Sequence, residues 1–293
     1  MTQPLSLPIA DELARRGIRP NRRLGQNFMI DRQMLDFLVR TAGVTDRDIV
    51  LEVGTGAGFL TERLCATAAR VVSVEIDAGL FGLAAERLAG FGNLTLIHGD
   101  ALAGERAWGE PVAQAIDRAL AELPGSPLKL VANLPYSIAT AVIQVVLESD
   151  SRFAGAWFTC QKEVADRLTA KPGTDDYGFV SVLADLLADV HFVRKLPPSV
   201  FWPRPKVDSA IVEVIGSEAK RSEIADMDAL RRGVSFLLTR RRKQLKASLK
   251  GLEASADRAR RLGEALCKLG IRDDERVFKL PPKVLKVIAE ILF

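Results

Sequence analysis

The first two thirds of the chain alternate short apolar runs with amphipathic stretches. Runs rich in β-branched residues lie at 49–53, 70–74 and 94–97, and a further apolar run ends at 131–132. Their length and composition are typical of buried strands, whereas the stretch at 59–69 has the pattern of a helix. An antiparallel-looking pair follows at 190–194 and 207–214. This alternation predicts an α/β fold with a doubly wound sheet.

Beyond residue 216 the pattern becomes helical throughout. Amphipathic periods are separated by Gly251, Gly263, Gly270 and a Pro281-Pro282 pair. We predict one helix over residues 228–250, with an apolar stripe made of Leu230, Val234, Leu237, Leu238, Leu245 and Leu249. The chain is therefore predicted to have three parts: a basic N-terminal arm at 1–23, an α/β domain at 24–215 and a smaller all-helical domain at 216–293.

Alternating glycines follow the first apolar run. Residues 49–58, IVLEVGTGAG, are typical of a strand, a tight turn and the start of a helix. Glycine in such a turn adopts positive φ and lets the backbone approach a ligand closely, so we expect a nucleotide-like cofactor. The spacing is G-x-G-x-G, and Phe59 stands where the dinucleotide fingerprint has its third glycine. This difference argues against an NAD-dependent dehydrogenase.

Carboxylates end the next two predicted strands. Glu75 lies about 20 residues beyond the glycines, where α/β folds place the acceptor for ribose hydroxyls. Asp100 follows the run at 94–97 and is suited to accept a hydrogen bond from an adenine amino group. A single acid in such a position is more often a helix cap or a loop residue. Acids at successive strand ends, however, are expected to line one crevice of an open α/β sheet.

The segment Asn133-Leu134-Pro135-Tyr136 follows the apolar run that ends at 131–132. An exocyclic amine has two N–H donors, so a pocket that positions it must offer acceptors such as the Asn133 side-chain oxygen and nearby carbonyls. Pro135 keeps the preceding residue extended, which leaves its carbonyl outside any helix ladder, and Tyr136 can stack on a base. The alternative is an ordinary strand-to-helix turn capped by asparagine.

Together these motifs resemble the ribosomal RNA adenine N6,N6-dimethyltransferase family, and the resemblance runs nearly from end to end. It is carried by residues 24–28 (LGQNF), 52–58 (EVGTGAG), 74–77 (VEID), 99–102 (GDAL), 133–136 (NLPY), 161–168 (QKEVADRL) and 201–209 (FWPRPKVDS). The resemblance implies a Rossmann-like methyltransferase sheet, S-adenosylmethionine as cofactor and S-adenosylhomocysteine as product. The segment at 103–129 is longer than the resemblance predicts, and we interpret its helical pattern at 112–123 as an additional surface helix.

The resemblance also implies roles for individual residues. Glu75 would hold the cofactor ribose and Asp100 the cofactor adenine. The other cofactor contacts would come from Gln26, Asn27, Met29, Glu52, Gly54, Gly56, Ile76, Ala101 and Asn133, with Gln26, Asn27, Glu52, Gly54 and Gly56 at the methionine end. The catalytic residues would be Asn133, Leu134, Pro135, Tyr136 and Phe201.

The chemistry expected at adenine N6 requires acceptors and aromatic rings and no strong base. The N6 lone pair is delocalised into the purine ring, so acceptors at Asn133 and at the Leu134 or Pro135 carbonyl would favour the attacking geometry. Positive charge develops on N6 during transfer, and π faces at Tyr136 and Phe201 would attract it in the transition state. The alternative for Phe201 is a packing role in a proline-stiffened loop. The target adenine should be unpaired or flipped.

The basic residues are clustered, although the net charge is only +4 and the pI about 9.0. They crowd the N-terminal arm and the run at 240–250. We predict RNA phosphate contacts from Arg22, Arg23, Arg204, Lys206, Arg240, Lys243, Lys246 and Lys250, with binding that weakens as salt is added. The alternative is a solvated outer helix face.

Composition and termini suggest a cytoplasmic protein. Residues 1–8 lack the pattern of a secretory signal, and no apolar run approaches the ~20 residues of a membrane span. Three cysteines without C-x-x-C spacing, and two histidines outside any dyad or metal spacing, predict no disulfide and no metal site. We expect a monomer that acts on rRNA in the small ribosomal subunit or its precursor, without a membrane partner.

Three other functions fit parts of the same pattern. The motifs are similar to those of large-subunit rRNA adenine methyltransferases of the antibiotic-resistance type, and more loosely to those of DNA adenine methylases. The long helical tail and the 161–168 motif favour the small-subunit enzyme. Outside catalysis, the chain could act chiefly as an assembly factor that binds immature subunits.

Overall fold

The computed structural model describes residues 9–104, 106–149, 152–250, 252 and 255–293. The N-terminal residues 1–8 and the predicted break at Gly251 lie outside the described residues. The chain divides into two compact units, one made of residues 1–165 and 191–215 and the other of residues 166–190 and 216–293. The second unit thus contains residues 166–190 in addition to the C-terminal part that begins at residue 216.

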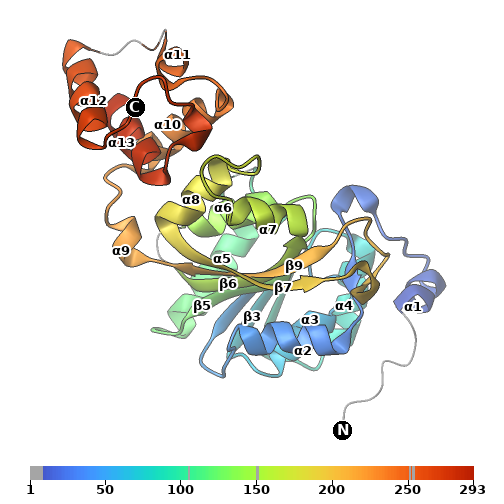
Figure 1. The fold of residues 1–293 in the computed structure, drawn as a ribbon. Helices are drawn as coiled ribbons and strands as arrows, with labels where there is room; N and C mark the ends of the chain where they lie inside the picture. The colour runs from blue at the N-terminus through green and yellow to red at the C-terminus, as the bar shows by residue number, and fades with distance from the viewer. Residues whose placement is uncertain (1–8, 105, 150–151, 251, 253–254) are drawn as a thin grey trace. The chain divides into compact units, whose positions relative to one another are not determined.

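A seven-stranded mixed sheet forms the centre of the first unit (Figure 1). Its order is β4-β3-β2-β5-β6-β9-β7, and the strands are β2 (Ile49–Val53), β3 (Arg70–Glu75), β4 (Leu94–His98), β5 (Leu128–Asn133), β6 (Phe153–Gln161), β7 (Ala188–Leu196) and β9 (Ser209–Gly216). Strands β2 to β6 pair in parallel, and β9 pairs with β6 antiparallel. A separate two-stranded sheet joins β1 (Phe28–Met29) to β8 (Phe201–Trp202).

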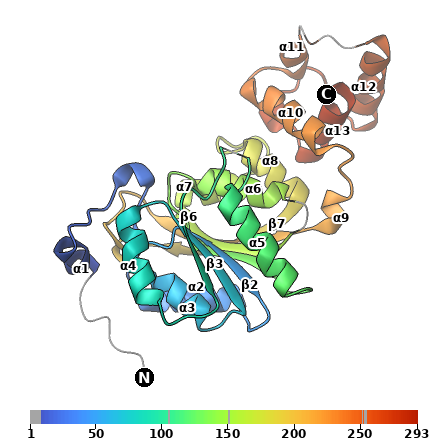
Figure 2. The same cartoon turned by 180° about the vertical axis from the view of Figure 1, so that it is seen from behind.

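Helices cover both faces of this sheet, which confirms the predicted doubly wound architecture. Figures 1 and 2 show α2 (Arg32–Thr41), α3 (Phe59–Cys65) and α4 (Ala78–Leu88) on one face, and α5 (Glu110–Glu122) and α6 (Ala139–Glu148) on the other. All five residues of β2 are buried, because this strand lies inside the sheet and between two helical layers. Shorter elements complete the fold: α1 (Ile9–Arg15), the 3-10 turns η1 (Arg22–Leu24) and η2 (Pro198–Val200), and α7 (Lys162–Leu168).

Helix α5 corrects our interpretation of the segment at 103–129. It packs against β2, β3 and β4, and it buries Val112, Ala115, Ile116 and Ala119. Consecutive parallel strands of one sheet require a crossover connection, and α5 lies in the connection from β4, at one edge of the sheet, to β5 beside β2. The helical pattern at 112–123 therefore belongs to the core architecture, and it is not an additional surface helix.

Helix α3 ends four residues earlier than the pattern at 59–69 predicts. The side-chain amide of Asn93 donates to the carbonyls of Cys65 and Ala68, at 2.9 Å each. Carbonyl groups in the last turn of a helix have no partner within the helix, so a distant amide can satisfy them and fix the end. The apolar pattern carries no information about this long-range contact.

The second unit is helical, as its sequence predicts. It contains α8 (Phe179–Leu187), α9 (Glu218–Arg221), α10 (Met227–Thr239), α11 (Leu245–Leu249), α12 (Ala256–Lys268), the 3-10 turn η3 (Val277–Lys279) and α13 (Pro282–Leu292). Helices α10 and α13 pack closely, and a Cβ on Gly233 would lie 2.3 Å from the Ala289 Cβ. No side chain fits between the two helices there, which explains why the position holds glycine.

The single helix predicted over 228–250 is wrong. Helix α10 ends at Thr239, and α11 begins only at Leu245. Between them, the carbonyls of Arg241 and Lys243 accept from the N–H groups of residues 278 and 277, and Gln244 forms an antiparallel bridge with Arg276. Because these backbone groups pair across to the segment at 273–278, they cannot continue the helix ladder. Leu245 stays buried, as the stripe predicted, whereas Leu249 is half-buried.

The segment at 171–177 is hydrogen-bonded to residues 241, 278 and 280 of the second unit. The hydroxyl of Tyr177 donates to the Leu280 carbonyl at 2.9 Å, and the N–H of Gly173 donates to the Phe278 carbonyl at 2.8 Å. The guanidinium of Arg241 donates to the carbonyls of Tyr177 and Asp175, at 2.6 and 2.8 Å. One cation of the basic run at 240–243 therefore has a structural role.

Candidate cofactor and active site

A cavity of about 250 Å³ opens at the carboxyl ends of the parallel strands in the first unit. Its wall is formed by the loops after β2, β3, β4 and β5 and by the segment at 23–28. The lining residues are Arg23, Leu24, Gly25, Gln26, Asn27, Phe28, Val53, Gly54, Gly56, Val74, Glu75, Ile76, Leu80, Gly99, Asp100, Ala101, Asn133, Pro135, Ser137 and Ile138. This is where open α/β sheets bind their ligands.

The glycine loop after β2 forms one side of the cavity. Gly54 and Gly56 have φ values of 86° and 57°, a region that residues with a side chain rarely adopt. A Cβ on Gly54 would lie 2.9 Å from the Cγ of Pro135. The glycine loop therefore packs directly against the Pro135 ring of the loop after β5, with no room for a side chain at residue 54.

Glu75 lies at the end of β3, with a carboxylate that supports the glycine loop. One oxygen accepts from the Gly56 N–H at 2.7 Å, and the other accepts from the Asp77 N–H at 2.9 Å. The side chain is buried and lines the cavity, and burial raises the pKa of its carboxyl. The next residue, Ile76, also lines the cavity, and it is 45% exposed, so an apolar face is open to a bound ring.

Asp100 lies in the loop after β4, which ends at His98. Its side chain is exposed and lines the cavity together with Gly99 and Ala101. One carboxylate oxygen accepts from the Leu102 N–H at 3.0 Å, which fixes the turn after the strand. The structure thus brings the two predicted strand-end acids, Glu75 and Asp100, into one cavity.

Glu52 lies behind the cavity wall and does not line it, unlike the direct ligand that the resemblance implied. It is 1% exposed, and one oxygen accepts from the hydroxyls of Thr61 and Ser73, each at 2.6 Å. Ser73 is in turn bonded to Thr55 at 2.6 Å. Burial raises the pKa of Glu52 to about 8, although its two hydroxyl partners oppose this rise. The glycine loop is thereby supported by a buried polar network.

The N-terminal segment forms another part of the wall. The Gln26 side chain accepts from the Asn21 N–H at 2.7 Å and donates to the Asp77 carboxylate at 3.4 Å. Gln26 and Asn27 line the cavity as expected. Met29 does not, because it is 3% exposed within β1 and belongs to the hydrophobic core.

The loop after β5 presents Asn133 and Pro135 to the cavity. The Asn133 amide donates to the Asn27 carbonyl at 2.8 Å, and its oxygen accepts from the Thr159 hydroxyl. The Pro135 carbonyl accepts from the Ile138 N–H at 3.1 Å. Of the two carbonyls that the sequence left open as acceptors, Pro135 is thus already engaged. The Leu134 side chain is 1% exposed and, like Tyr136, lies outside the cavity wall.

The two aromatic residues that were predicted to be catalytic, Phe201 and Tyr136, are not among the residues that line the cavity. The Phe201 ring is 1% exposed and belongs to the core, so the packing role left open by the sequence is the one seen here. The neighbouring Trp202 is half-buried and stacks on Phe28, with ring centroids 6.2 Å apart. Phe28 lines the cavity and was not among the predicted site residues. Tyr136 is half-buried, and its hydroxyl is 2.5 Å from the Ser209 hydroxyl.

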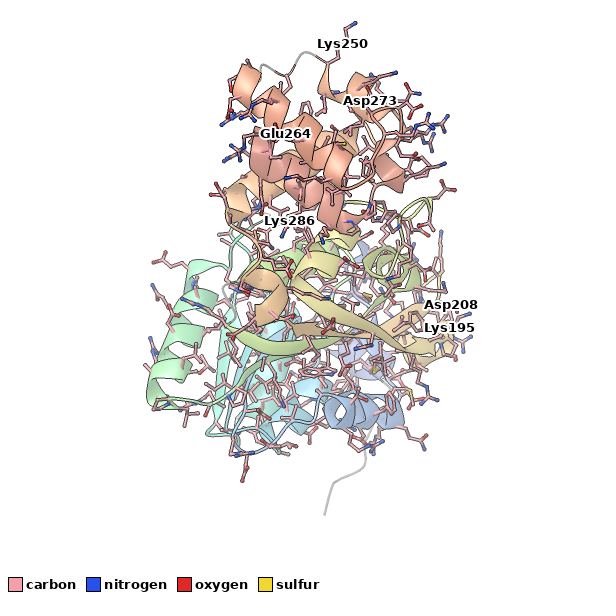
Figure 3. The ribbon with its side chains drawn as sticks, turned by 60° about the vertical axis from the view of Figure 1, so that its left-hand side comes forward. Lys195, Asp208, Lys250, Glu264, Asp273 and Lys286 are labelled. Atoms are coloured by element: carbon pink, nitrogen blue, oxygen red, sulfur yellow. The ribbon has the colours of Figure 1, made fainter. Side chains whose placement is uncertain are left out.

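The predicted RNA-binding residues fall on both units. In the first unit Arg22, Arg23, Arg204 and Lys206 are exposed, and Arg23 also lines the cavity. In the second unit Lys243, Lys246 and Lys250 are exposed, and Figure 3 shows Lys250 pointing away from the ribbon. Arg240 is half-buried, with its guanidinium 4.5 Å above the Phe236 ring. Arg16 of the N-terminal arm forms an ion pair with Glu86 at 2.8 Å. Part of the positive charge of the arm is therefore balanced by an acid outside it.

Within the part of the chain that the structure describes, no group of three or more His, Cys, Asp or Glu side chains is arranged to hold a metal ion. No described helix combines the length and apolar character needed to cross a membrane. Cys65, Cys160 and Cys267 form no disulfide; Cys65 and Cys160 are buried, and Cys267 is exposed.

The sheet order, the glycine loop after β2 and the acids after β3 and β4 define a Rossmann-like, S-adenosylmethionine-dependent methyltransferase. Solved structures have the same fold. A dimethyladenosine transferase from Plasmodium falciparum aligns over 90% of this chain and 96% of its own, with a TM-score of 0.68 and 24% identity. The 23S rRNA methyltransferase ErmE aligns over 90% of this chain and 99% of its own, with a TM-score of 0.60 and 27% identity.

Sequence comparison gives the family. Residues 17–292 match the family model for ribosomal RNA adenine dimethylase. The ribosomal RNA small subunit methyltransferase A of Clostridium acetobutylicum is 35% identical over 84% of this chain and 85% of its own length. The protein of that name from Magnetococcus marinus is 39% identical over 81% of each chain. The chain belongs to the ribosomal RNA adenine dimethylase family, and it is an rRNA methyltransferase.

Proposed function

We propose that this enzyme transfers methyl groups from S-adenosylmethionine to N6 of adenines in the rRNA of the small ribosomal subunit. The products are N6,N6-dimethyladenosine and S-adenosylhomocysteine. One observation carries the proposal: Asn133 and Pro135 of the loop after β5 line the same cavity as the glycine loop and the two strand-end acids. A cofactor held by the glycines and acids would lie beside the acceptors that a purine amine needs.

The residues of the cavity fit the cofactor. S-adenosylmethionine carries an ammonium group, ribose hydroxyls and an adenine amine, all of which donate hydrogen bonds, and when bound it supplies an electrophilic methyl group. Glu75 and Asp100 offer carboxylate acceptors, and the Gly54 and Gly56 backbone leaves room for close approach. We assign the ribose to Glu75, the adenine to Asp100 and Ile76, and the methionine end to Gln26, Asn27 and the glycine loop. Glu52 supports that end from behind.

The target amine would lie against Asn133. The Asn133 oxygen has two lone pairs and receives one hydrogen bond from Thr159, so one lone pair remains for an N6 hydrogen. The second hydrogen goes to the Leu134 or the Pro135 carbonyl; the Pro135 carbonyl accepts one hydrogen bond from Ile138 and keeps a second lone pair. These acceptors hold N6 in the geometry of attack. After transfer the N6 ammonium loses its proton to water, so no strong base is needed.

Exposed cations on each unit provide the attraction for RNA. The side chains are Arg22, Arg23, Arg204 and Lys206 in the first unit and Lys243, Lys246 and Lys250 in the second. Phosphate contacts of this kind fix register and give affinity without reading bases. We infer that the enzyme binds folded rRNA through phosphates and selects an unpaired adenine at the cavity.

The small subunit is favoured over the large one by the relatives. The curated proteins cited above carry small-subunit names at 35–39% identity, whereas ErmE, a 23S rRNA methyltransferase, is 27% identical. A role as an assembly factor on immature subunits is compatible with the same surfaces, and methylation and binding would then be separable.

The test combines cells and purified protein. In cells that lack the gene, primer extension should show adenines of the small-subunit rRNA that have lost dimethylation, with the large-subunit rRNA unchanged. Calorimetry should show that the purified chain binds S-adenosylhomocysteine. Loss of methylation confined to large-subunit rRNA would establish the alternative substrate, and failure to bind S-adenosylhomocysteine would refute the cofactor assignment.

A further inference from the structure

The loop that presents Asn133 is held by two buried hydroxyls from the sheet beneath it. The Thr159 hydroxyl donates to the Asn133 side-chain oxygen, and the Thr159 carbonyl accepts from the Leu134 N–H at 3.2 Å. Two residues further along the loop, the Tyr136 and Ser209 hydroxyls are 2.5 Å apart. Thr159 and Ser209 are both 0% exposed.

The sheet register explains why these two hydroxyls reach the same loop. Thr159 on β6 lies opposite Asn133 on β5, and Ser209 on β9 lies opposite Gln161 on β6. Side chains alternate along a strand, so residues 159 and 161 share one face, and Ser209 joins them as the diagonal neighbour of Thr159. The two hydroxyls therefore lie on the same face of the sheet, under the loop.

Burial makes each hydroxyl dependent on its loop partner. Water does not reach either group, and buried polar atoms in native proteins are almost always hydrogen-bonded. At Asn133 both ends of the amide are assigned, because the nitrogen donates to Asn27 and the oxygen accepts from Thr159. The amide is thus fixed with its oxygen, rather than its nitrogen, beside the place of an incoming amine. Tyr136 is fixed in the same way by its hydroxyl.

We propose that Thr159 and Ser209 are positioning residues of this methyltransferase, acting through Asn133 and Tyr136. The inference rests on the proposed function, because it needs those two side chains to contact the target adenine. Neither hydroxyl lines the cavity. Their removal should therefore affect turnover more than cofactor binding.

The first experiment compares Thr159→Val with Thr159→Ser. Valine keeps the volume and removes the hydroxyl, whereas serine keeps the hydroxyl. Methyl transfer is measured with radiolabelled S-adenosylmethionine on small subunits from cells that lack the gene. We expect Thr159→Val to lower kcat about tenfold with KM for subunits unchanged, and Thr159→Ser to stay within about threefold of the parent enzyme, since small misplacements at a reacting centre have large effects.

The second experiment is a double-mutant cycle between Ser209→Ala and Tyr136→Phe. Each change removes one partner of the same hydrogen bond, and Phe keeps the aromatic ring. We expect each single variant to lower kcat by a similar factor of about five, and the double variant to be no worse than either one. The matched control is Ser181→Ala, which removes a buried serine hydroxyl that bonds to Arg167 and Gly178 in the second unit.

Binding of S-adenosylhomocysteine reports folding for every variant, and it should remain within about threefold of the parent value. If Thr159→Val does not fold, Thr159→Ala replaces it. Parental kcat in a folded Thr159→Val or Ser209→Ala enzyme, or additive losses in the cycle, would overturn the inference. An unmodified enzyme that does not methylate the small subunit would instead refute the proposed function, so the two failures are distinguishable.

Discussion

The cavity of the first unit and the basic surface of the second unit use polar groups in opposite ways. Around the cavity, Glu52 and Glu75 are buried, Asn133 is half-buried, and all three are held by neighbouring donors and acceptors. On the second unit, Lys243 and Lys246 remain in solvent. Buried groups act through fixed geometry, and exposed cations act through charge that salt screens. Substitutions in the two regions should therefore fail in different ways.

The largest effect is expected from Asn133→Ala, which tests the geometric side of the comparison. The change removes an acceptor at the target amine and a donor to Asn27, so kcat for methyl transfer should fall about a thousandfold, as for loss of a preorganised catalytic hydrogen-bonding group. Binding to the small subunit should be unchanged, because no exposed cation is removed. Asn93→Ala is the matched control: it should lower stability through the end of α3 and leave kcat near the parent value. Parental turnover of Asn133→Ala would refute the site assignment.

Next in size is the effect of pH on stability through Glu52. Its pKa is raised by burial to about 8 in the folded state, above the ordinary glutamate value of 4.5. The carboxyl therefore favours folding while it is protonated, and this contribution is lost as the pH rises from about 4.5 through 8. Glu52→Gln cannot ionise, so its free energy of unfolding should rise relative to the parent enzyme by on the order of 3 kcal/mol between pH 5 and pH 8. Urea unfolding across that range measures the difference, and a flat difference would contradict the buried network.

Gly54→Ala tests the steric requirement for glycine in the cavity wall, because it adds a methyl group and changes no charge. The added Cβ would lie 2.9 Å from Pro135, and φ at this position is 86°. We expect the affinity for S-adenosylhomocysteine to fall about a hundredfold, through strain and the displaced loop. Gly82→Ala in α4 is the control, since nothing lies within 4 Å of its added Cβ, and it should be neutral or slightly stabilising. Calorimetry on both variants gives the comparison, and equal affinities would contradict the close approach of the two loops.

The smallest effect is expected on the basic surface. Replacing Lys243, Lys246 and Lys250 together by glutamine should weaken binding to the small subunit about tenfold at low salt. The dependence of log affinity on log salt should become shallower by up to about 1 per lysine removed. Binding of S-adenosylhomocysteine should not change. Filter binding at several salt concentrations checks this, and an unchanged slope would mean that this face is only a solvated helix surface.

Much of the first unit could be predicted because its motifs are local. The glycines and the acids Glu75 and Asp100 follow apolar runs directly, and parallel strands place such ends at one edge of the sheet. The burial of Glu52 behind the cavity wall could not be predicted, because position in a motif does not reveal which way a side chain faces. The burial of Phe201 depends on pairing between β1 and β8, two short strands far apart in the sequence.

The elements that sequence reasoning missed depend on long-range pairing. The apolar stripe at 228–250 is real, yet residues 241–246 bond across to 273–278, and no periodic pattern signals that exchange. Thr159 and Ser209 stand in ordinary strand sequences, and they become relevant only through the register of β5, β6 and β9. The sequence signal that could have indicated Thr159 and Ser209 was a polar residue near the end of an otherwise apolar, buried strand.

The N-terminal wall of the cavity has a consequence for biosynthesis. The side chain of Asn133 bonds to Asn27 across 106 residues, and that of Ser137 bonds to Leu24 across 113 residues. A nascent chain cannot close such distant loops until both partners have been translated, and contacts of this separation form slowly. Roughly the first half of the polypeptide must emerge before the pocket acquires its full enclosure, so shortened translation products would be unable to sequester the methyl donor.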